Sequence, residues 1–389
     1  MKRLGILLSA GTGGGVLQYS QAIVDAADAL PAEYSITAAI ADPLWRGTIP
    51  PRMRVLELDD SLWNRGLNRV SHASRMSVAV WRHTLARLDT NVRRLVSENC
   101  DLWICPNHDR YVFRAPIPAL GTVHDLMHRY ERKFPEVSAN GEFEAREFHF
   151  RETGRWAKGL LVDSKLGKSQ LVDSYGVAPE KVHVLPYIAP AYIHDDDGDD
   201  IPTVRQRYNL PPKFFFYPAQ FYQHKNHLRL IDAVAGLRET HPDVKLVLVG
   251  AKERNGYDAV RRHVSWSGLE DSVIFLGYVP DGDMPALYRT ARALVMPTFF
   301  GPTNIPQLEA FALGCPVATS RIYGIPAQVG DAAMLFDPES VSEIQDCLAR
   351  LWTDDALCAE LVARGHRHAE GWGRPQFRER FREIVEALL

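Results

Sequence analysis

The sequence contains no long apolar run. A helix that spans a bilayer needs roughly 18 or more apolar residues, and no segment of this chain approaches that length. The run Leu4–Ala10 follows Lys2 and Arg3 and so imitates a signal peptide, but it is short and leads into glycines without a cleavage site. We therefore expect a cytoplasmic protein in which this run is a β-strand.

Cysteine pairs and a dominant charge are also missing. The five cysteines are odd in number and form no Cys-x-x-Cys pair, so reduced, structural thiols of a cytosolic protein are expected. The net charge of −3 gives no reason to expect nucleic acid as a partner.

What the sequence does contain is a repeated alternation of short apolar strands and helical segments. Its length suggests about two domains. Strands rich in Val, Ile, Leu and Phe that alternate with helices imply parallel sheets covered on both faces, which predicts a doubly wound α/β domain twice over. The predicted strands are Arg3–Ser9, Ser35–Ala41, Asp101–Cys105, Pro118–Thr122, Leu160–Asp163 and Val182–Pro186, then Lys213–Ala219, Val244–Gly250, Val273–Leu276, Ala293–Pro297, Pro316–Ser320 and Met334–Phe336.

An acidic stretch, residues 189–202, separates the two halves. It holds aspartates on both sides of Gly198 and is too polar to bury a core, so we interpret it as a linker between domains at 1–188 and 203–373. The alternative is a DxD-type metal site for a diphosphate, but no strand precedes the stretch to aim its carboxylates. We therefore predict no metal site.

A glycine loop, Gly11–Gly15, follows the first strand and precedes a predicted helix over Val16–Leu30. Glycines at this point allow backbone N–H groups to approach an anion. The spacing is not GxGxxG, which argues against a nicotinamide dinucleotide. A ligand cradle that includes Gly13 and Gly14 and a merely tight strand–helix turn both remain open.

Lys225 follows the first strand of the second half, at a predicted helix start. Ligands of open α/β sheets bind at this edge, and a compact ammonium group suits a diphosphate. A surface lysine is the alternative, although a cation is unfavourable at the positive end of a helix dipole.

The stretch Met296–Val317 is the most specific in the sequence. Thr303 or Asn304 is expected to cap a helix whose first turn contains Pro306. Glu309 lies one turn further on among apolar neighbours, where a carboxylate needs a partner. The vicinal hydroxyls of a ribose would supply one; a structural salt bridge is the other interpretation.

Together these motifs resemble the retaining GT-B enzymes of glycosyltransferase family 4. Met296–Val317, the Lys225 segment and Ser320–Phe336 are similar to that family's donor-binding signature in order, spacing and context. The similarity covers nearly all of the C-terminal half, and the N-terminal half matches more loosely. The resemblance implies an α/β GT-B fold of two facing Rossmann-like domains with parallel sheets and an interdomain active-site cleft.

The resemblance also implies site residues. Glu309 would hold the nucleotide ribose and Lys225 the diphosphate, both counted as catalytic together with His124. The residues implied to contact the donor are Gly13, Gly14, Gln220, Lys225, Gly277, Tyr278, Thr303, Asn304, Ile305 and Glu309, with Gly277 and Tyr278 near the base.

Two residues depart from the family pattern. Gly301 stands where the family usually has a glutamate, and Gln220 stands where it often has an arginine. The first change removes a contact to the donor sugar, and the second removes a positive charge near the diphosphate.

His124 and Asp125 follow the predicted strand Pro118–Thr122. By resemblance, His124 would lie near the donor sugar and the acceptor hydroxyl, where an imidazole can position a hydroxyl. A histidine satisfied by local backbone is the plain alternative. Asp125 and Arg129 are the predicted acceptor-binding residues.

Two further segments each allow two interpretations. Trp63–Arg94 is basic and amphipathic, so it is either an anionic-membrane contact or a domain helix with a solvated face. Residues 374–389 resemble the family's terminal helix that packs back on the N-terminal domain, the alternative being an ordinary terminal helix of the second domain.

The sequence thus predicts a metal-independent, retaining hexosyltransferase without cofactor. Its expected partners are a nucleotide-sugar donor, GDP-mannose being favoured, and a saccharide or polyprenyl-diphosphate-linked saccharide acceptor, as in bacterial polysaccharide and O-antigen synthesis. The expected location is the cytoplasm, with a peripheral position at the inner membrane face as an option. The main alternative is a non-catalytic nucleotide-sugar-binding scaffold of a polysaccharide assembly complex. A third interpretation, a sugar-nucleotide epimerase of similar architecture, is not supported by the signature Thr303–Glu309.

Overall fold

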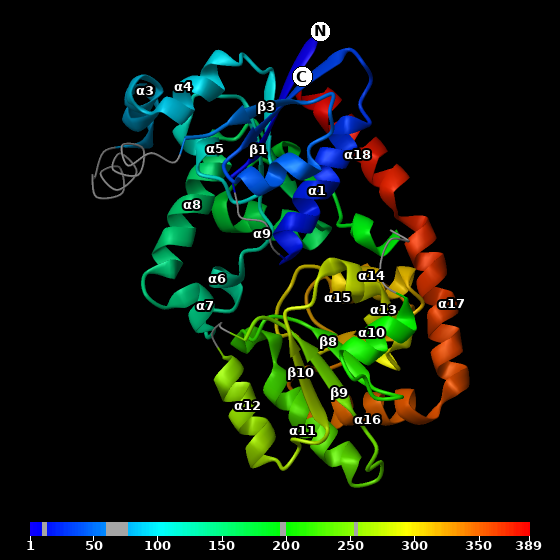
Figure 1. Ribbon diagram of the computed structural model, residues 1–389. Coiled ribbons are helices and arrows are strands. Elements are labelled where there is room, and N and C mark those ends of the chain that lie inside the picture. Colours follow the sequence, from blue (N-terminus) through cyan, green and yellow to red (C-terminus); the bar gives the residue numbers. More distant parts are fainter. Residues whose placement is uncertain (10–13, 60–76, 195–199, 253–255) are drawn as a thin grey trace. The chain divides into compact units, whose positions relative to one another are not determined.

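The computed structural model describes residues 1–9, 14–59, 77–194, 200–252 and 256–389 (Figure 1). The chain divides into two compact units. The first comprises Met1–Tyr130, Gly141–Ile188 and Arg374–Leu389, and the second comprises Glu131–Asn140 and Ala189–Gly373.

The first unit is built on a sheet whose described strands number seven, paired in parallel in the order β3-β2-β1-β4-β5-β6-β7. The order reverses between β1 and β4, which makes these strands the topological switch point. The strands are β1 (Lys2–Leu8), β2 (Tyr34–Ile40), β3 (Arg54–Glu57), β4 (Leu102–Cys105), β5 (Ala119–Thr122), β6 (Gly159–Val162) and β7 (Val182–Val184).

Helices connect these strands. Those of the first unit are α1 (Gly14–Asp28), α3 (Val78–Leu88), α4 (Thr90–Ser97), α5 (Tyr111–Arg114), α6 (Met127–Tyr130), α8 (Glu142–Trp156), α9 (Lys165–Tyr175) and α18 (Arg374–Leu388), with 3-10 turns η1 (Pro43–Thr48) and η2 (Pro179–Lys181).

Helix α18 packs on α1 inside the first unit. Phe377 is fully buried and its ring meets Tyr19 edge-on at a centroid distance of 6.3 Å. The guanidinium of Arg378 donates to both carboxylate oxygens of Asp25, at 2.9 and 2.6 Å. An apolar stripe and a bidentate ion pair therefore fix the last helix to the first.

The second unit contains a parallel sheet with six described strands in the order β10-β9-β8-β11-β12-β13. Its switch point lies between β8 and β11. The strands are β8 (Phe215–Pro218), β9 (Leu246–Val249), β10 (Val273–Gly277), β11 (Ala293–Met296), β12 (Val317–Ser320) and β13 (Ala333–Phe336).

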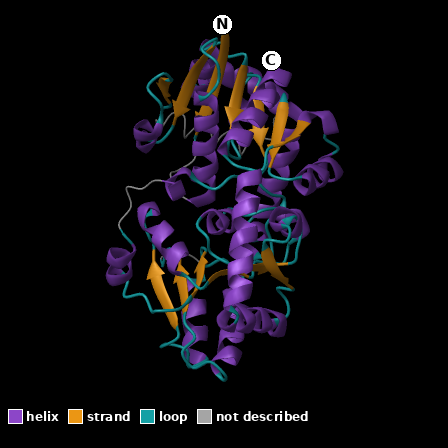
Figure 2. Ribbon diagram, turned by 90° about the vertical axis from the view of Figure 1, so that its right-hand side faces the viewer, coloured by secondary structure: helices purple, strands orange, loops and turns teal. Residues whose placement is uncertain are grey.

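Helices cover both faces of this sheet (Figure 2). Along β8, Phe215 and Tyr217 join one buried cluster, whereas Phe214 and Phe216 join another. Since alternate residues of a strand point to opposite faces, both faces are covered. The helices are α7 (Pro135–Ser138), α10 (Ile201–Arg207), α11 (His227–Arg238), α12 (Tyr257–Trp266), α13 (Met284–Thr290), α14 (Pro306–Ala312), α15 (Ile325–Val329), α16 (Val341–Thr353) and α17 (Asp355–Gly371), with 3-10 turns η3 (Ala191–His194), η4 (Gln223–Lys225) and η5 (Asp281–Asp283).

The predicted fold class is confirmed, since two doubly wound parallel sheets are present and each predicted strand overlaps an observed one. Strand β3 was not predicted, because this edge strand is mostly exposed and carries no apolar run. No helix in the described parts of the chain combines the length and apolarity needed to cross a bilayer.

Candidate functional site

The lysine turn, residues Ala219–Asn226, follows β8 at the switch point of the second sheet. Lys225 ends the 3-10 turn η4, and Asn226 adopts a left-handed conformation (φ 58°) before α11 begins. The carboxyl ends of strands beside a switch point are where open α/β sheets bind ligands. The structure thus places Lys225 at the edge where an anionic ligand is expected.

Hydrogen bonds fix the backbone of the lysine turn. The hydroxyl of Tyr217, on β8, donates to the carbonyl of Lys225 at 2.9 Å. The buried amide of Asn226 donates to the carbonyls of Pro297 and Pro338 at 2.8 and 2.9 Å. Because these prolines follow β11 and β13, the turn is tied to three strand ends of one sheet.

The β11 loop, residues Pro297–Ile305, follows the other strand of the switch point. Gly301 has a φ of 153°, and a Cβ added there would lie 2.5 Å from Nδ2 of Asn304. The backbone of Asn304 exchanges two hydrogen bonds with Gln328, at 2.9 and 2.7 Å. The glycine is therefore a requirement of this loop's shape.

The predicted cap of the following helix is wrong. Helix α14 begins at Pro306 with Ile305 as its N-cap, and within the described chain no side chain caps it. Thr303 and Asn304 belong to the preceding loop instead, where the pairing with Gln328 holds the Asn304 backbone away from capping geometry.

Glu309, in the first turns of α14, is buried and accepts hydrogen bonds from two tyrosines. The hydroxyl of Tyr192 lies 2.5 Å from Oε1, and the hydroxyl of the fully buried Tyr288 donates to Oε2. Burial raises the pKa of Glu309, and the two tyrosine hydrogen bonds act in the opposite direction. Each carboxylate oxygen still has a second acceptor position, which a ribose hydroxyl can use.

The two tyrosines were missed from sequence. Tyr192 falls in the stretch interpreted as a linker, and Tyr288 falls in a helix, α13, with no motif around it. Only the tertiary fold brings them to Glu309, so no spacing in the sequence signals the contact.

Three other predicted donor residues lie on the same carboxyl edge. Gln220 is the second residue of the lysine turn, and its Oε1 is buried without a hydrogen-bond partner among the residues that the structure describes. Gly277 ends β10 with a φ of 81°, and a Cβ there would lie 3.0 Å from Cε of Lys252. Tyr278 follows and is 74% exposed. Lys252 is thus a cation beside the predicted base site that the sequence reasoning did not single out.

In the first unit, His124 follows β5 and is held on both ring nitrogens. Nε2 lies 2.9 Å from the carbonyl of Pro106, and Nδ1 lies 2.8 Å from the hydroxyl of Tyr187. Because a carbonyl only accepts, Nε2 carries the proton and Nδ1 accepts from the tyrosine. Burial lowers the pKa of His124 to about 4, so the imidazole is neutral near pH 7.

The glycine loop is described only in part. Gly13 lies outside the described residues, and Gly14 opens α1 with a φ of 67°. Ser9, just before the loop, donates a hydrogen bond to Asp109, which follows β4. The two strands of this switch point are therefore tied together at their carboxyl ends.

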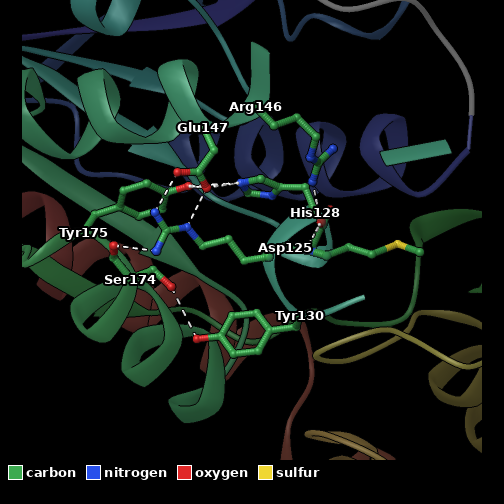
Figure 3. A network of polar contacts seen from close by, with 9 residues as sticks. Asp125, His128, Tyr130, Arg146, Glu147, Ser174 and Tyr175 are labelled. Carbon is green, nitrogen blue, oxygen red and sulfur yellow. Dashed lines mark hydrogen bonds and ion pairs between the residues drawn. The ribbon is translucent and has the colours of Figure 1, made fainter. Parts of the chain in front are cut away.

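The predicted acceptor residue Asp125 belongs to a network of polar contacts (Figure 3), and the hydrogen bonds of Arg129 to Glu147 place the second predicted residue in the same network. Asp125 accepts from the backbone of Met127 at 2.8 Å and pairs with Arg146. Arg129 binds Glu147 through Nε at 2.5 Å and Nη2 at 2.6 Å. Both side chains thus shape the α6–α8 region.

Two further contacts complete this network. Arg129 also donates from Nη1 to the carbonyl of Ser174 at 2.7 Å and lies over the ring of Tyr175. The hydrogen bond from Arg129 lowers the pKa of Glu147 to about 2. The arginine is thus held by partners within the first unit.

Among the described residues, no group of three or more His, Cys, Asp or Glu side chains is placed to hold a metal ion. Most of the acidic stretch considered as a DxD site, residues 195–199, lies outside the described residues.

Comparison with known proteins identifies the domain type. Residues 200–368 match the family of glycosyl transferases group 1. The chain is 26% identical over 296 residues to O-antigen chain mannosyltransferase B of Escherichia coli, an alignment that covers 71% of this chain and 74% of the relative. It is 26% identical over 279 residues to mannosylfructose-phosphate synthase of Agrobacterium fabrum, covering 65% of this chain and 60% of that protein.

A solved structure shows the same fold. The structure of Anabaena HepE in complex with UDP and glucose aligns over 100% of both chains, with a TM-score of 0.76 and 17% sequence identity. The described architecture thus has a counterpart among GT-B glycosyltransferase structures.

Proposed function

The chain is a mannosyltransferase-like glycosyltransferase of the GT-B fold, and from this premise we propose that it transfers a hexose from a nucleoside diphosphate to a saccharide acceptor with retention of anomeric configuration. The donor binds the carboxyl edge of the second sheet. The acceptor is a saccharide, free or linked to polyprenyl diphosphate, and binds the first unit near His124, Asp125 and Arg129.

One observation carries the donor assignment. Lys225 and Glu309 lie far apart in sequence, yet they belong to the segments that follow β8 and β11, the two strands of one switch point. A cation on a fixed backbone and a buried carboxylate at this edge suit the two ends of a ribose diphosphate. Gly277 and Tyr278, at the end of β10, supply a surface for the base.

The same geometry supports a metal-independent reaction. As the nucleoside diphosphate departs, negative charge builds on its terminal phosphate, and the ammonium group of Lys225 stabilises it from a backbone that is fixed in advance. We propose a front-side reaction through an oxocarbenium-like state, without a covalent glycosyl–enzyme intermediate.

His124 acts in this proposal as a neutral positioning group. Its two ring nitrogens are engaged by Pro106 and Tyr187, and its pKa of about 4 keeps the imidazole unprotonated at neutral pH. A neutral ring fixed in this way orients neighbouring groups and does not donate a proton to the leaving phosphate.

We propose mannose, delivered by GDP-mannose, as the transferred sugar. The named activity of the Escherichia coli relative is mannosyl transfer, whereas the Anabaena structure contains UDP. The base therefore has to be identified directly.

The decisive experiment measures transfer and binding together. Wild-type protein is tested with GDP-mannose, UDP-glucose, ADP-glucose and dTDP-glucose against a panel of saccharide acceptors, and thermal stabilisation by each donor is recorded. A donor at about 100 times its Kd stabilises the folded state by about 2.7 kcal/mol. We expect thermal stabilisation and acceptor-dependent turnover with donors of one base class. In Lys225→Ala, both the donor affinity and the turnover should fall at least tenfold. The assignment is refuted if no donor at millimolar concentration stabilises the protein.

The alternative, a non-catalytic nucleotide-sugar-binding scaffold, is favoured by one observation. Gly301 and Gln220 replace two residues of the family pattern, and Gly301 is required by its loop. A scaffold would show donor binding without turnover for every acceptor, whereas an epimerase would convert the donor without any acceptor.

We also propose a peripheral position at the inner membrane face. Within α3 and α4, Arg87, Arg93 and Arg94 are exposed together with the apolar Val80 and Leu88. Basic and apolar side chains side by side suit an anionic bilayer surface. The membrane position is supported if the protein co-sediments with phosphatidylglycerol vesicles and if this binding is lost at high salt and in Arg87→Glu/Arg93→Glu. Equal recovery with phosphatidylcholine vesicles opposes the membrane position.

A further inference from the structure

A short segment from the first half of the sequence is built into the second unit. The strap, residues Glu131–Asn140, lies in the chain between α6 and α8 of the first unit, yet it groups with the second. It contains the one-turn helix α7. Its side chains end on the lysine turn and on the β11 loop, the two segments assigned above to the donor.

Glu136 of the strap holds His224, the residue before Lys225. Its Oε1 accepts from the backbone N–H of His224 at 3.0 Å and from ring Nδ1 at 2.5 Å. The Glu136 side chain is 13% exposed and the His224 side chain 14%. Since an ionised carboxylate only accepts, the imidazole must carry its proton on Nδ1, and both the ring and the backbone of the turn are oriented by one oxygen.

His224 in turn holds the β11 loop. Its carbonyl accepts from the backbone N–H of Phe299 at 2.7 Å. The hydroxyl of Thr298 lies 3.1 Å from the same carbonyl, but it lies closer, at 2.7 Å, to the carbonyl of Phe300. Its ring stacks on Tyr222, with an interplanar angle of 13°. The residue that Glu136 orients therefore bridges the two segments of the switch point, beside the hydrogen bond from Asn226 to Pro297.

Burial strengthens this bridge, because Phe299, whose backbone N–H donates to the His224 carbonyl, is buried. Thr298 is fully buried and Phe299 nearly so. A buried donor that loses its acceptor costs free energy, which couples the two segments. A displacement of His224 would therefore move the β11 loop as well as Lys225.

Other contacts fasten the strap at its start. The ring of Phe134 stacks on Phe299 at a centroid distance of 5.7 Å. Lys133 lies 3.3 Å from the carboxylate of Glu339, and the hydroxyl of Tyr323 donates to Glu131 at 2.5 Å. The contacts of Lys133 and Glu131 hold the strap away from the lysine turn, whereas the ring of Phe134 also meets the ring of His224 at a centroid distance of 6.1 Å. Glu136 supplies the hydrogen bonds from the strap to the lysine turn.

We propose that Glu136 is a positioning residue for glycosyl transfer, which orients His224 and thereby sets the backbone that presents Lys225 to the donor diphosphate. The inference rests on the proposed function of Lys225. Burial alone would raise the pKa of Glu136, but the hydrogen bonds from His224 lower it below its ordinary value. The carboxylate is thus ionised at neutral pH and accepts from both donors, as the geometry requires.

The test compares diphosphate with monophosphate binding. Full-length wild type, Glu136→Ala and Lys225→Ala are titrated with GDP and GMP, and with UDP and UMP, and transfer kinetics give the donor KM and kcat. Glu339→Ala is the matched control, because Glu339 is an acidic partner of the same strap but does not contact the lysine turn. His224→Phe keeps the ring but lacks the Nδ1 donor, so it tests the same contact if Glu136→Ala does not fold.

We expect Glu136→Ala and His224→Phe to raise the Kd of the diphosphate and the donor KM about tenfold, because the charge-assisted contact of Lys225 with the diphosphate is weakened. The Kd of the monophosphate should change less than about twofold. Glu136→Gln, whose amide oxygen can accept both hydrogen bonds, should recover most of the affinity. In the Lys225→Ala background, Glu136→Ala should have little further effect, because the two residues act through one contact.

Four results overturn the proposal. Unchanged diphosphate affinity in Glu136→Ala, equal weakening of mono- and diphosphate, or the same effect from Glu339→Ala each assign Glu136 a merely structural role. If Lys225→Ala itself leaves diphosphate affinity unchanged, the proposed donor site fails and the positioning role fails with it. If Lys225→Ala weakens the diphosphate while Glu136→Ala does not, only the positioning role is refuted.

Discussion

Replacing Glu309 by alanine separates its structural contribution from its proposed contact with ribose. The change removes the carboxylate that accepts from Tyr192 and Tyr288. Tyr288 is fully buried, so its hydroxyl loses an acceptor that water cannot replace, whereas the partly exposed Tyr192 can turn to solvent. The first loss costs about 1 to 3 kcal/mol.

Two smaller effects accompany that loss. Truncating the side chain leaves space beside α14 and costs about another 1 kcal/mol. Removing a carboxylate whose burial raises its pKa recovers part of the total, because ionising it costs folding free energy. We expect a net loss of about 2 kcal/mol, a fall in Tm of roughly 4 to 8 °C for a unit of this size.

The assay is urea unfolding followed by fluorescence at pH 7, with Glu309→Gln as the control. The amide keeps an acceptor for one tyrosine, so the control should lose less than about 1 kcal/mol. Burial makes the pKa of Glu309 higher in the folded state than in the unfolded state, so the protonated form favours folding. The stability that this group contributes to wild type is therefore lost as the pH rises through the folded-state pKa. The control should therefore gain stability relative to wild type over the same rise in pH.

Nucleotide binding then tests the ribose contact in the stable control. If Glu309 accepts from ribose hydroxyls, wild type should bind a ribonucleoside diphosphate about tenfold more tightly than its 2′,3′-dideoxy analogue, and Glu309→Gln should lose most of that preference. Equal stability of Glu309→Ala and wild type would refute the tyrosine contacts. An undiminished preference for ribose in Glu309→Gln would refute the role in binding.

Three other predictions test the remaining geometry. Burial lowers the pKa of His128 and of His149 to about 4, so the neutral form of each contributes up to about 3 kcal/mol to the free energy of unfolding. This contribution is lost as the pH falls from 6.5 to about 4. Urea unfolding at pH 7 and pH 4.5 should show the loss, and His128→Gln should reduce it. Gly301→Glu restores the family residue, and it should lower stability by about 1 to 3 kcal/mol without increasing turnover. The control Gly47→Glu should be tolerated, because an added Cβ there meets no other atom. A Gly301→Glu variant that is more active than wild type contradicts the loop geometry. The hydrogen bond from Arg129 lowers the pKa of Glu147 to about 2, so Glu147→Gln should lower the free energy of unfolding by about 1 to 2 kcal/mol at pH 7. The difference in stability between the variant and wild type should vanish as the pH falls from 4.5 towards about 2. A difference that persists in acid argues against the ion pair.

The sequence predicted the strands of both sheets because their apolar runs are buried on two faces. It failed at β3, an exposed edge strand whose residues carry no such pattern. It also failed at the cap of α14, because the backbone of Asn304 pairs with Gln328, a partner 24 positions away. Local capping rules do not contain that competition.

The candidate site was predictable only where it follows strand ends. Lys225 and Glu309 stand in segments whose position after β8 and β11 is readable from the strand pattern. Tyr288 and Glu136 contact those segments through the tertiary fold, 21 positions from Glu309 and 88 positions from His224 respectively. Such long-range partners leave no local pattern in the sequence.

The position of α18 has a consequence for the order in which the protein is completed during synthesis. This helix supplies Phe377 and Phe381 to the core of the first unit, although residues 189–373 are translated before it. At about 5 to 20 residues per second, a ribosome needs roughly 10 to 40 s to pass from one to the other. Throughout that interval α1 lacks the helix that covers it, so a nascent first unit waits for the last segment of its own core while the second unit is already being made.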